Sequence, residues 1–114
     1  MVGTDTIKNN YDFRRLYSKG ESKVSPYLAV YAMKRKYGIR RLGITVSTQV
    51  GCAVIRNRVR RRIREAYRLN EAKFIEQVDI IIVARVRAGN ATYAQLEKSL
   101  LTLAGELGIL KETI

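Results

Sequence analysis

The chain alternates between segments with a helical spacing of hydrophobic residues and shorter runs that are typical of strands. In three segments the apolar residues recur every three or four positions, which predicts amphipathic helices. Four other runs, rich in β-branched and aromatic residues or alternating in polarity, predict strands. The predicted elements, in chain order, are a helix at 11–17, strands at 21–24, 27–33 and 42–47, a helix at 51–70, a strand at 78–84 and a helix at 93–107.

Capping residues mark the ends of the first and last helices. Asn9 or Asn10 can accept a hydrogen bond at the start of the first helix, and Gly20 can end it. Thr92 and Gln95 have the spacing of a capping box at the start of the last helix. These two helices therefore have definite boundaries in the sequence.

The spacing of the strands suggests how they pair. Strands 27–33 and 42–47 are joined by a short basic connection with a glycine, which predicts that they pair as a hairpin. The run at 78–84 is almost continuously apolar, which is typical of a strand buried on both faces. Together the elements predict an α+β fold in one domain, residues 1–114, with a small mixed sheet packed with three helices in the order α-β-β-β-α-β-α.

The helix at 51–70 carries an unusual charge. Its residues 56–68 include seven arginines and one acid, and the whole chain has a formal net charge of +12. Like charges four positions apart oppose helix formation, and a polyanionic partner would offset that cost. Guanidinium groups suit bidentate contact with phosphates, so we expect this helix to bind RNA. On a helical wheel the apolar stripe contains Ile55, Val59, Ile63, Ala66 and Tyr67, with Arg56 and Arg62 at its flanks, and the opposite face contains Asn57, Arg60, Arg61, Arg64 and Arg68.

The residue types that the chain lacks narrow its function. It has no histidine and one cysteine, Cys52, which excludes a histidine general base and a zinc-finger type of site. The ten acids are scattered, so we expect neither catalytic residues nor a metal site in the protein itself. The single cysteine, expected to be partly buried, favours a reducing cytoplasm. No segment approaches the roughly 20 apolar residues of a membrane span, so we expect no membrane partner.

Four aromatic residues of the first helix and the following strand are expected to face one another. Two interpretations stay open on spacing alone: ordinary core packing, or the floor of a groove on which unpaired bases stack. The residues are Phe13, Tyr17, Tyr27 and Tyr31.

The region from 41 to 68 resembles the protein subunit of bacterial ribonuclease P. Residues 41–47 read RLGITVS, and residues 51–68 read GCAVIRNRVRRRIREAYR, which match that family's strand and its following arginine helix. Three further features follow the family's order: Asp12-Phe13, the strand 78–84 followed by Arg85, and Thr92-Tyr93. The resemblance therefore covers nearly the whole chain.

The resemblance implies a protein that assists a catalytic RNA in removing the 5′ leader from precursor tRNA, with Mg²⁺ bound mainly by the RNA. It also implies a left-handed β-α-β crossover, an arginine helix that faces the catalytic RNA, and a cleft between the first helix and the sheet for the single-stranded leader. The expected contacts with the catalytic RNA, taken from the resemblance and the helical wheel, are Arg56, Asn57, Arg58, Arg60, Arg61, Arg62, Arg64 and Arg68. The expected leader-binding residues are Phe13, Tyr17, Tyr31, Thr48, Gln49 and Arg85.

The chain departs from the family pattern at three positions near this site. Thr48 and Gln49 stand where the family usually has lysines, and Cys52 stands where asparagine or lysine is more usual. Besides the leading interpretation, composition and fold class also suit a ribosomal-type structural RNA-binding protein. A DNA-binding protein and a stand-alone nuclease fit less well, and the oligomeric state stays open.

Overall fold

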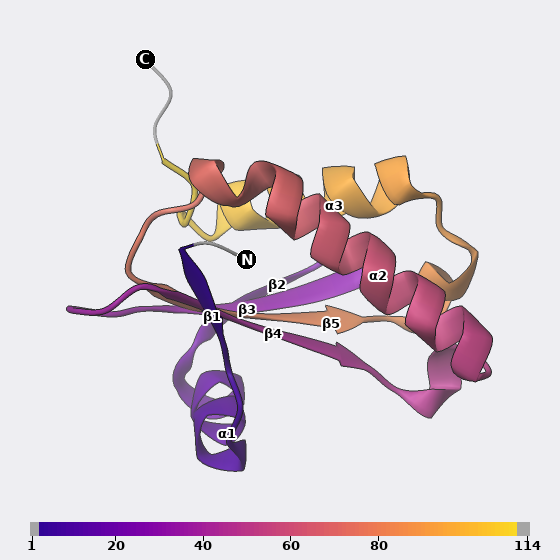
Figure 1. Cartoon of the computed structure of the whole chain (residues 1–114), viewed down its shortest axis with the longest axis horizontal. Helices are drawn as coiled ribbons and strands as arrows, with labels where there is room; N and C mark the ends of the chain where they lie inside the picture. The colour runs from indigo at the N-terminus through magenta and orange to yellow at the C-terminus, as the bar shows by residue number, and fades with distance from the viewer. Residues whose placement is uncertain (1–2, 112–114) are drawn as a thin grey trace.

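The computed structural model describes residues 3–111, which form a five-stranded mixed sheet with helices on both of its faces (Figure 1). The predicted α+β class is confirmed. The short connections include 3₁₀ turns at Thr48–Val50, Glu71–Lys73 and Val86–Asn90. The elements are β1 (Thr4–Thr6), α1 (Asn10–Lys19), β2 (Glu21–Val24), β3 (Leu28–Lys34), β4 (Arg40–Val46), α2 (Ala53–Asn70), β5 (Val78–Ala84) and α3 (Tyr93–Glu106).

The strands follow the order β1-β4-β5-β3-β2 across the sheet. β5 pairs in parallel with β4 and antiparallel with β3, so β3 and β4 are not neighbours. The predicted hairpin of these two strands is therefore wrong. β5 takes the central place because nearly all its side chains are apolar, and only a central strand covered on both faces buries them all.

The sequence pattern also missed β1, so the observed order of elements begins with a strand. Thr4–Thr6 pairs in parallel with Arg40–Leu42 at the edge of the sheet. These three residues are mostly polar and have no hydrophobic alternation, so only their pairing with β4 makes them a strand. The predicted strand at 21–24 is confirmed as β2.

The two faces of the sheet are covered differently. α2 and α3 lie on one face and α1 on the other (Figure 1). Successive side chains of β5 point to opposite faces of the sheet. Ile80 and Ile82 pack in the large core under α2 and α3, whereas Ile81 packs in a small core under α1. The predicted stripes of α2 and α3 both pack on the large core.

The predicted helix caps are also confirmed. The Asn9 side chain accepts a hydrogen bond from the Asp12 N–H, and α1 ends at Gly20. Thr92 and Gln95 form the capping box of α3. The parallel strands β4 and β5 are joined through α2 as a β-α-β unit, whose left-handed sense stays a prediction of the family resemblance.

Candidate nucleic-acid interface

An aromatic cluster lies between α1 and the sheet. The ring of Phe13 packs directly on β4 at Gly43, where an added Cβ atom would lie 2.9 Å from two ring carbons. Tyr17, one helical turn further, meets Tyr31 of β3 edge to face, with ring centroids 4.9 Å apart. The Phe13 and Tyr17 centroids are 6.4 Å apart. The absence of a side chain at Gly43 therefore lets α1 bring its aromatic residues onto the sheet. We call Phe13, Tyr17, Tyr31 and Thr45 the aromatic face.

The aromatic face is open to solvent on one side. Tyr17 is 41% exposed, and Phe13, Tyr31 and Thr45 are half-buried. The Tyr17 hydroxyl lies 3.4 Å from the hydroxyl of Thr45. A shallow groove runs along this side, lined by Asn10, Phe13, Arg14, Tyr17 and Thr45.

Tyr27 does not belong to this cluster. It packs against the large core on the opposite face of the sheet and lies under the guanidinium group of Arg87, 5.9 Å from the ring centroid. The expectation that all four aromatic residues face one another is therefore wrong for Tyr27. Tyr27 is half-buried and packs against the large core, whereas the other three share a surface that is partly open to solvent. That unpaired bases stack on this surface stays a prediction.

An ion-pair network holds α1 in place. Arg41 of β4 donates two hydrogen bonds to the buried carboxylate of Asp79, at 2.9 and 2.7 Å, and a third to Asp12 of α1 at 3.1 Å. Arg35 adds a contact of 3.5 Å with Asp79. These hydrogen bonds raise the pKa of Arg41 above its usual value, so its positive charge is permanent. The network fixes the first turn of α1 on the sheet, next to Phe13.

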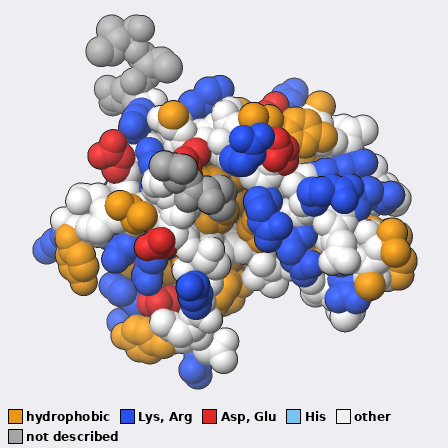
Figure 2. Space-filling view, in the orientation of Figure 1, with side chains coloured by type: hydrophobic (Ala, Val, Ile, Leu, Met, Phe, Trp, Pro, Cys, Tyr) orange, Lys and Arg blue, Asp and Glu red, His pale blue; other side chains and the backbone are white. Residues whose placement is uncertain are grey.

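The arginine helix presents only part of its charge to solvent. Arg61 and Arg64 are exposed, as is Asn57, which accepts a hydrogen bond from the half-buried Arg60 at 3.1 Å. The exposed Arg68 is paired with Glu65. Figure 2 shows Lys and Arg side chains gathered over α2. The predicted polar face of this helix is thus confirmed as a basic surface.

Three of the predicted RNA contacts donate hydrogen bonds to backbone carbonyls of neighbouring segments. Arg58 and Arg62 donate to the backbone carbonyls of Gly89 and Ala91, at 3.1 and 2.7 Å. Arg56 donates to the carbonyl of Gly51 at 3.1 Å. These half-buried arginines therefore hold the segments around α2 together, a role that their sequence pattern did not reveal.

The remaining candidates lie around one end of the sheet. Thr48 and Gln49 are exposed in the 3₁₀ turn that joins β4 to α2, so they lie between Thr45 of the aromatic face and the start of the arginine helix. Arg85 follows β5 and donates a hydrogen bond of 2.7 Å to the carbonyl of Ser25 in the turn between β2 and β3.

Cys52, expected to be partly buried, is exposed at the N-cap of α2. The backbone N–H groups of Ile55 and Val54 lower the pKa of its thiol, because they stabilise the thiolate. Residues 48–52 thus link the aromatic face to α2, with Thr48, Gln49 and Cys52 exposed and Val50 buried in the large core.

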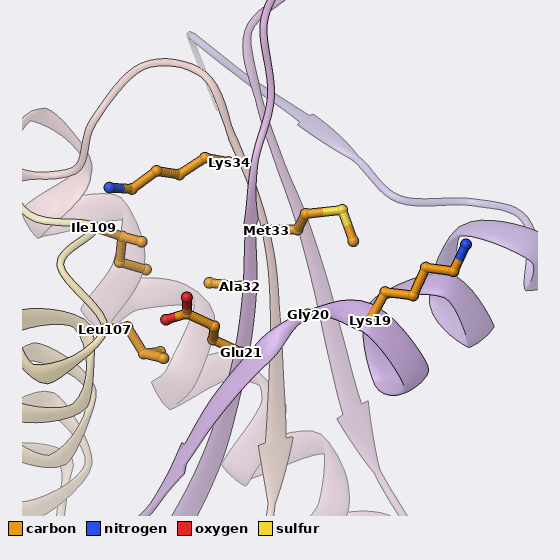
Figure 3. A pocket seen from close by; sticks show the side chains of 8 residues that line it. All are labelled: Lys19, Gly20, Glu21, Ala32, Met33, Lys34, Leu107 and Ile109. Atoms are coloured by element: carbon orange, nitrogen blue, oxygen red, sulfur yellow. The ribbon is translucent and has the colours of Figure 1, made fainter.

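A further hollow in the described structure lies outside the aromatic face and the basic surface of α2. Figure 3 shows a hollow at the β2 edge of the sheet, near the end of α3, where Leu107 and Ile109 face Glu21 and Lys34. No residue of α2 or of the aromatic face lines it. Among residues 3–111, no three histidine, cysteine or acidic side chains lie close enough to hold a metal ion together. Within the same range no helix is long and apolar enough to cross a membrane.

Comparisons with known proteins agree with this architecture. The family model described as Ribonuclease P matches residues 1–108. The ribonuclease P protein component of Clostridioides difficile is 45% identical over 101 residues, covering 88% of this chain and 89% of that protein. The protein component of Alkaliphilus oremlandii is 36% identical over 114 residues, covering 100% of each chain.

Solved structures show the same fold. The RNase P protein of Staphylococcus aureus superposes with a TM-score of 0.84 at 36% identity, covering 93% of this chain and 97% of that one. The Thermotoga maritima protein, solved in complex with 1-(4-fluorophenyl)-2-thiourea, superposes with a TM-score of 0.77 at 26% identity, covering 84% and 94%. The chain therefore belongs to the ribonuclease P protein family, and it functions with an RNA subunit in processing the 5′ end of tRNA.

Proposed function

We propose that this protein is a non-catalytic subunit that docks on the catalytic RNA through α2 and holds the 5′ leader of precursor tRNA on the aromatic face. The observation that supports this most directly is the placement of the two surfaces. β4 contributes Thr45 to the aromatic face and then leads through the turn Thr48–Val50 into α2. One rigid body can therefore contact both RNAs at neighbouring positions.

The basic surface of α2 suits the phosphate backbone of a folded RNA. Arg61 and Arg64 are free to reach phosphates because they are exposed, and the pair of Arg60 with Asn57 places another guanidinium beside them. Each phosphate neutralised in this way releases counterions, which makes the binding dependent on salt. The hydrogen bonds of Arg58 and Arg62 to backbone carbonyls hold α2 in place although its arginine side chains repel one another.

The aromatic face suits unpaired nucleotides. Aromatic rings that stack on bases contribute about 1–3 kcal/mol per base and accept every base type, which fits leaders of variable sequence. Tyr17 and Phe13 lie along one groove, and Arg14 at its edge can meet a phosphate. Thr48, Gln49 and Arg85 lie beyond the groove, where further leader nucleotides would pass.

The residues of the protein suit a division of labour in which the RNA binds Mg²⁺. The carboxylates beside the aromatic face, Asp12 and Asp79, are already paired with Arg41, and the arginines of α2 repel cations. We therefore assign Mg²⁺, and the hydrolysis that it supports, to the RNA. The protein would lower the Mg²⁺ requirement by neutralising nearby phosphates. The cytoplasmic location stays a prediction.

A cleavage assay tests this proposal. The purified protein is added to its RNA subunit with precursor tRNA at a low Mg²⁺ concentration, at which the RNA alone cleaves slowly. We expect faster cleavage with the protein, and no cleavage by the protein without the RNA. Cleavage no better than with RNA alone would refute RNA assistance, and cleavage by the protein alone would refute the non-catalytic role.

A further inference from the structure

The loop between β3 and β4 is a second basic surface, remote from the start of α2. Residues 34–41 contain five basic residues and no acid. Lys34 and Lys36 are exposed, and Tyr37 is 74% exposed, one of the most exposed large side chains of the described chain. Figure 1 shows the loop projecting from the sheet, and Figure 2 shows hydrophobic and basic side chains together at that end of the molecule.

Arg35 gives the loop a defined shape. Its guanidinium group lies 5.5 Å from the centroid of the Tyr37 ring and donates a hydrogen bond of 3.1 Å to the carbonyl of Ile39. The same group contacts the buried Asp79 at 3.5 Å, which anchors it to the core of the sheet. Gly38 turns the chain with a φ of 85°, a conformation that glycine adopts without strain. Tyr37 is therefore held by a fixed partner although it is exposed.

This arrangement leaves Tyr37 suited to stacking. One face of its ring is covered by the guanidinium group, and the exposed remainder can receive a base. The exposed ammonium group of Lys36, the neighbour of Tyr37 in the sequence, can meet a phosphate beside that base. A cation–π contact of this kind also pre-organises the ring, so less entropy is lost when a base binds.

We infer that the β3–β4 loop, through Tyr37 and Lys36, binds an unpaired nucleotide of the RNA subunit. The inference rests on the proposed docking of α2 on that RNA and adds a second contact. β4 separates the loop from the start of α2 by about 20 Å, the length of a strand of seven residues, so the two contacts would fix the orientation of the protein on the RNA.

The substrate leader is the less suitable partner for this loop. The hydrogen bond between Asp12 and Arg41 holds the first turn of α1 on the sheet between the aromatic face and the loop. The groove beside Phe13 and Tyr17 is lined by residues of α1 and by Thr45, and by no residue of the β3–β4 loop, so a leader strand held in it would not reach Tyr37 within that groove.

Binding of the full-length protein to the isolated RNA subunit tests the inference. Tyr37→Ala should weaken this affinity at least about 5-fold, as expected for loss of one stacked base. Tyr37→Phe should bind nearly as the wild type does, because it keeps the ring. Tyr11→Ala is the matched control, since Tyr11 is 70% exposed but belongs to α1 and not to the loop.

The remaining outcomes are distinct. An unchanged affinity of Tyr37→Ala for the RNA subunit overturns the inference. It is also overturned if Tyr37→Ala weakens only the binding of precursor tRNA with long leaders, because the partner is then the substrate. Arg64→Gln separates this result from the proposed docking of α2: if that variant binds more weakly while Tyr37→Ala does not, α2 docks and the loop does not.

Discussion

The two faces of the sheet differ in what they bury and in what they expose. Under α2 and α3 the side chains form one large core, with Val59, Ile63 and Tyr67 of α2 at most 1% exposed. Under α1 the core consists of three buried residues, and the aromatic side chains around it remain partly open to solvent. The covered face therefore supplies most of the hydrophobic stabilisation, and the open face keeps apolar surface free for a ligand.

The helices on the two faces are also attached to the sheet in different ways. α2 and α3 are held mainly by a wide apolar interface, to which the hydrogen bonds of Arg58 and Arg62 add. α1 covers little apolar area and is fixed instead by Gly43 beneath Phe13 and by the bonds of Arg41 to Asp12 and Asp79. A binding surface can thus stay open because its geometry is set by a few directional contacts.

The largest effect is expected from the covered face. Ile63→Ala should lower the free energy of unfolding by about 2–5 kcal/mol, because it leaves a cavity in the large core. Urea denaturation measures this change, and Leu69→Ala, at a 57% exposed position of the same helix, is the control with little loss. A small loss for Ile63→Ala would mean that the covered face does not dominate stability.

The open face should respond in binding more than in stability. Tyr17→Ala should reduce the preference for precursor tRNA over mature tRNA by about 5-fold or more, because one stacking ring is lost. It should lower the free energy of unfolding by only about 1 kcal/mol, the scale of its aromatic contacts. Titration of the holoenzyme with both tRNAs gives the ratio, and Tyr17→Phe should keep it. If Tyr17→Ala leaves the ratio unchanged, the aromatic face does not bind the leader.

A smaller contrast is expected within α2. Arg64→Gln should reduce the slope of log K against log salt for binding to the RNA subunit by about one or less, with an unchanged urea midpoint. Arg62→Gln should lower the urea midpoint, because the hydrogen bond to the Ala91 carbonyl is lost. Equal slopes for wild type, Arg64→Gln and Arg60→Gln would show that the outer face of α2 is only solvated.

The smallest effect is a pH dependence of the covered face. Burial raises the pKa of Tyr67 above its ordinary value of 10.0. Above pH 10 the unfolded chain therefore releases this proton while the folded chain retains it, so stability should fall as the pH rises. Urea midpoints between pH 8 and 11 should show a steeper fall for the wild type than for Tyr67→Phe. Parallel curves would contradict this assignment.

Much of the fold could be predicted because α2 and α3 have a strong helical periodicity and β5 is an almost continuous apolar run. The pairing of β3 with β4 was mispredicted because neighbouring strands usually pair, and local spacing does not show that a later strand, β5, enters between them. β1 was missed because its pattern is polar and its pairing depends wholly on β4.

The sequence predicted which residue types lie at the site better than it predicted the contacts that each residue makes. The spacing of Phe13 and Tyr17 placed both on one side of α1, but their dependence on Gly43 requires the sheet. The internal bonds of Arg58 and Arg62 depend on a loop about thirty residues away in sequence, which no helical wheel contains. Likewise, the partners of Arg41 come from two other elements.

The central place of β5 also bears on the order of events during synthesis. β3 and β4 leave the ribosome well before β5, yet each lacks its inner neighbour until Ala84 has been added. A partly synthesised chain exposes two unpaired strand edges, which are prone to aggregation and suited to chaperones. Gly43 and Thr45 of β4 and Tyr31 of β3 reach their places in the aromatic face only when β5 has paired between the two strands. The aromatic face should therefore form in one late step, when the last strand is inserted.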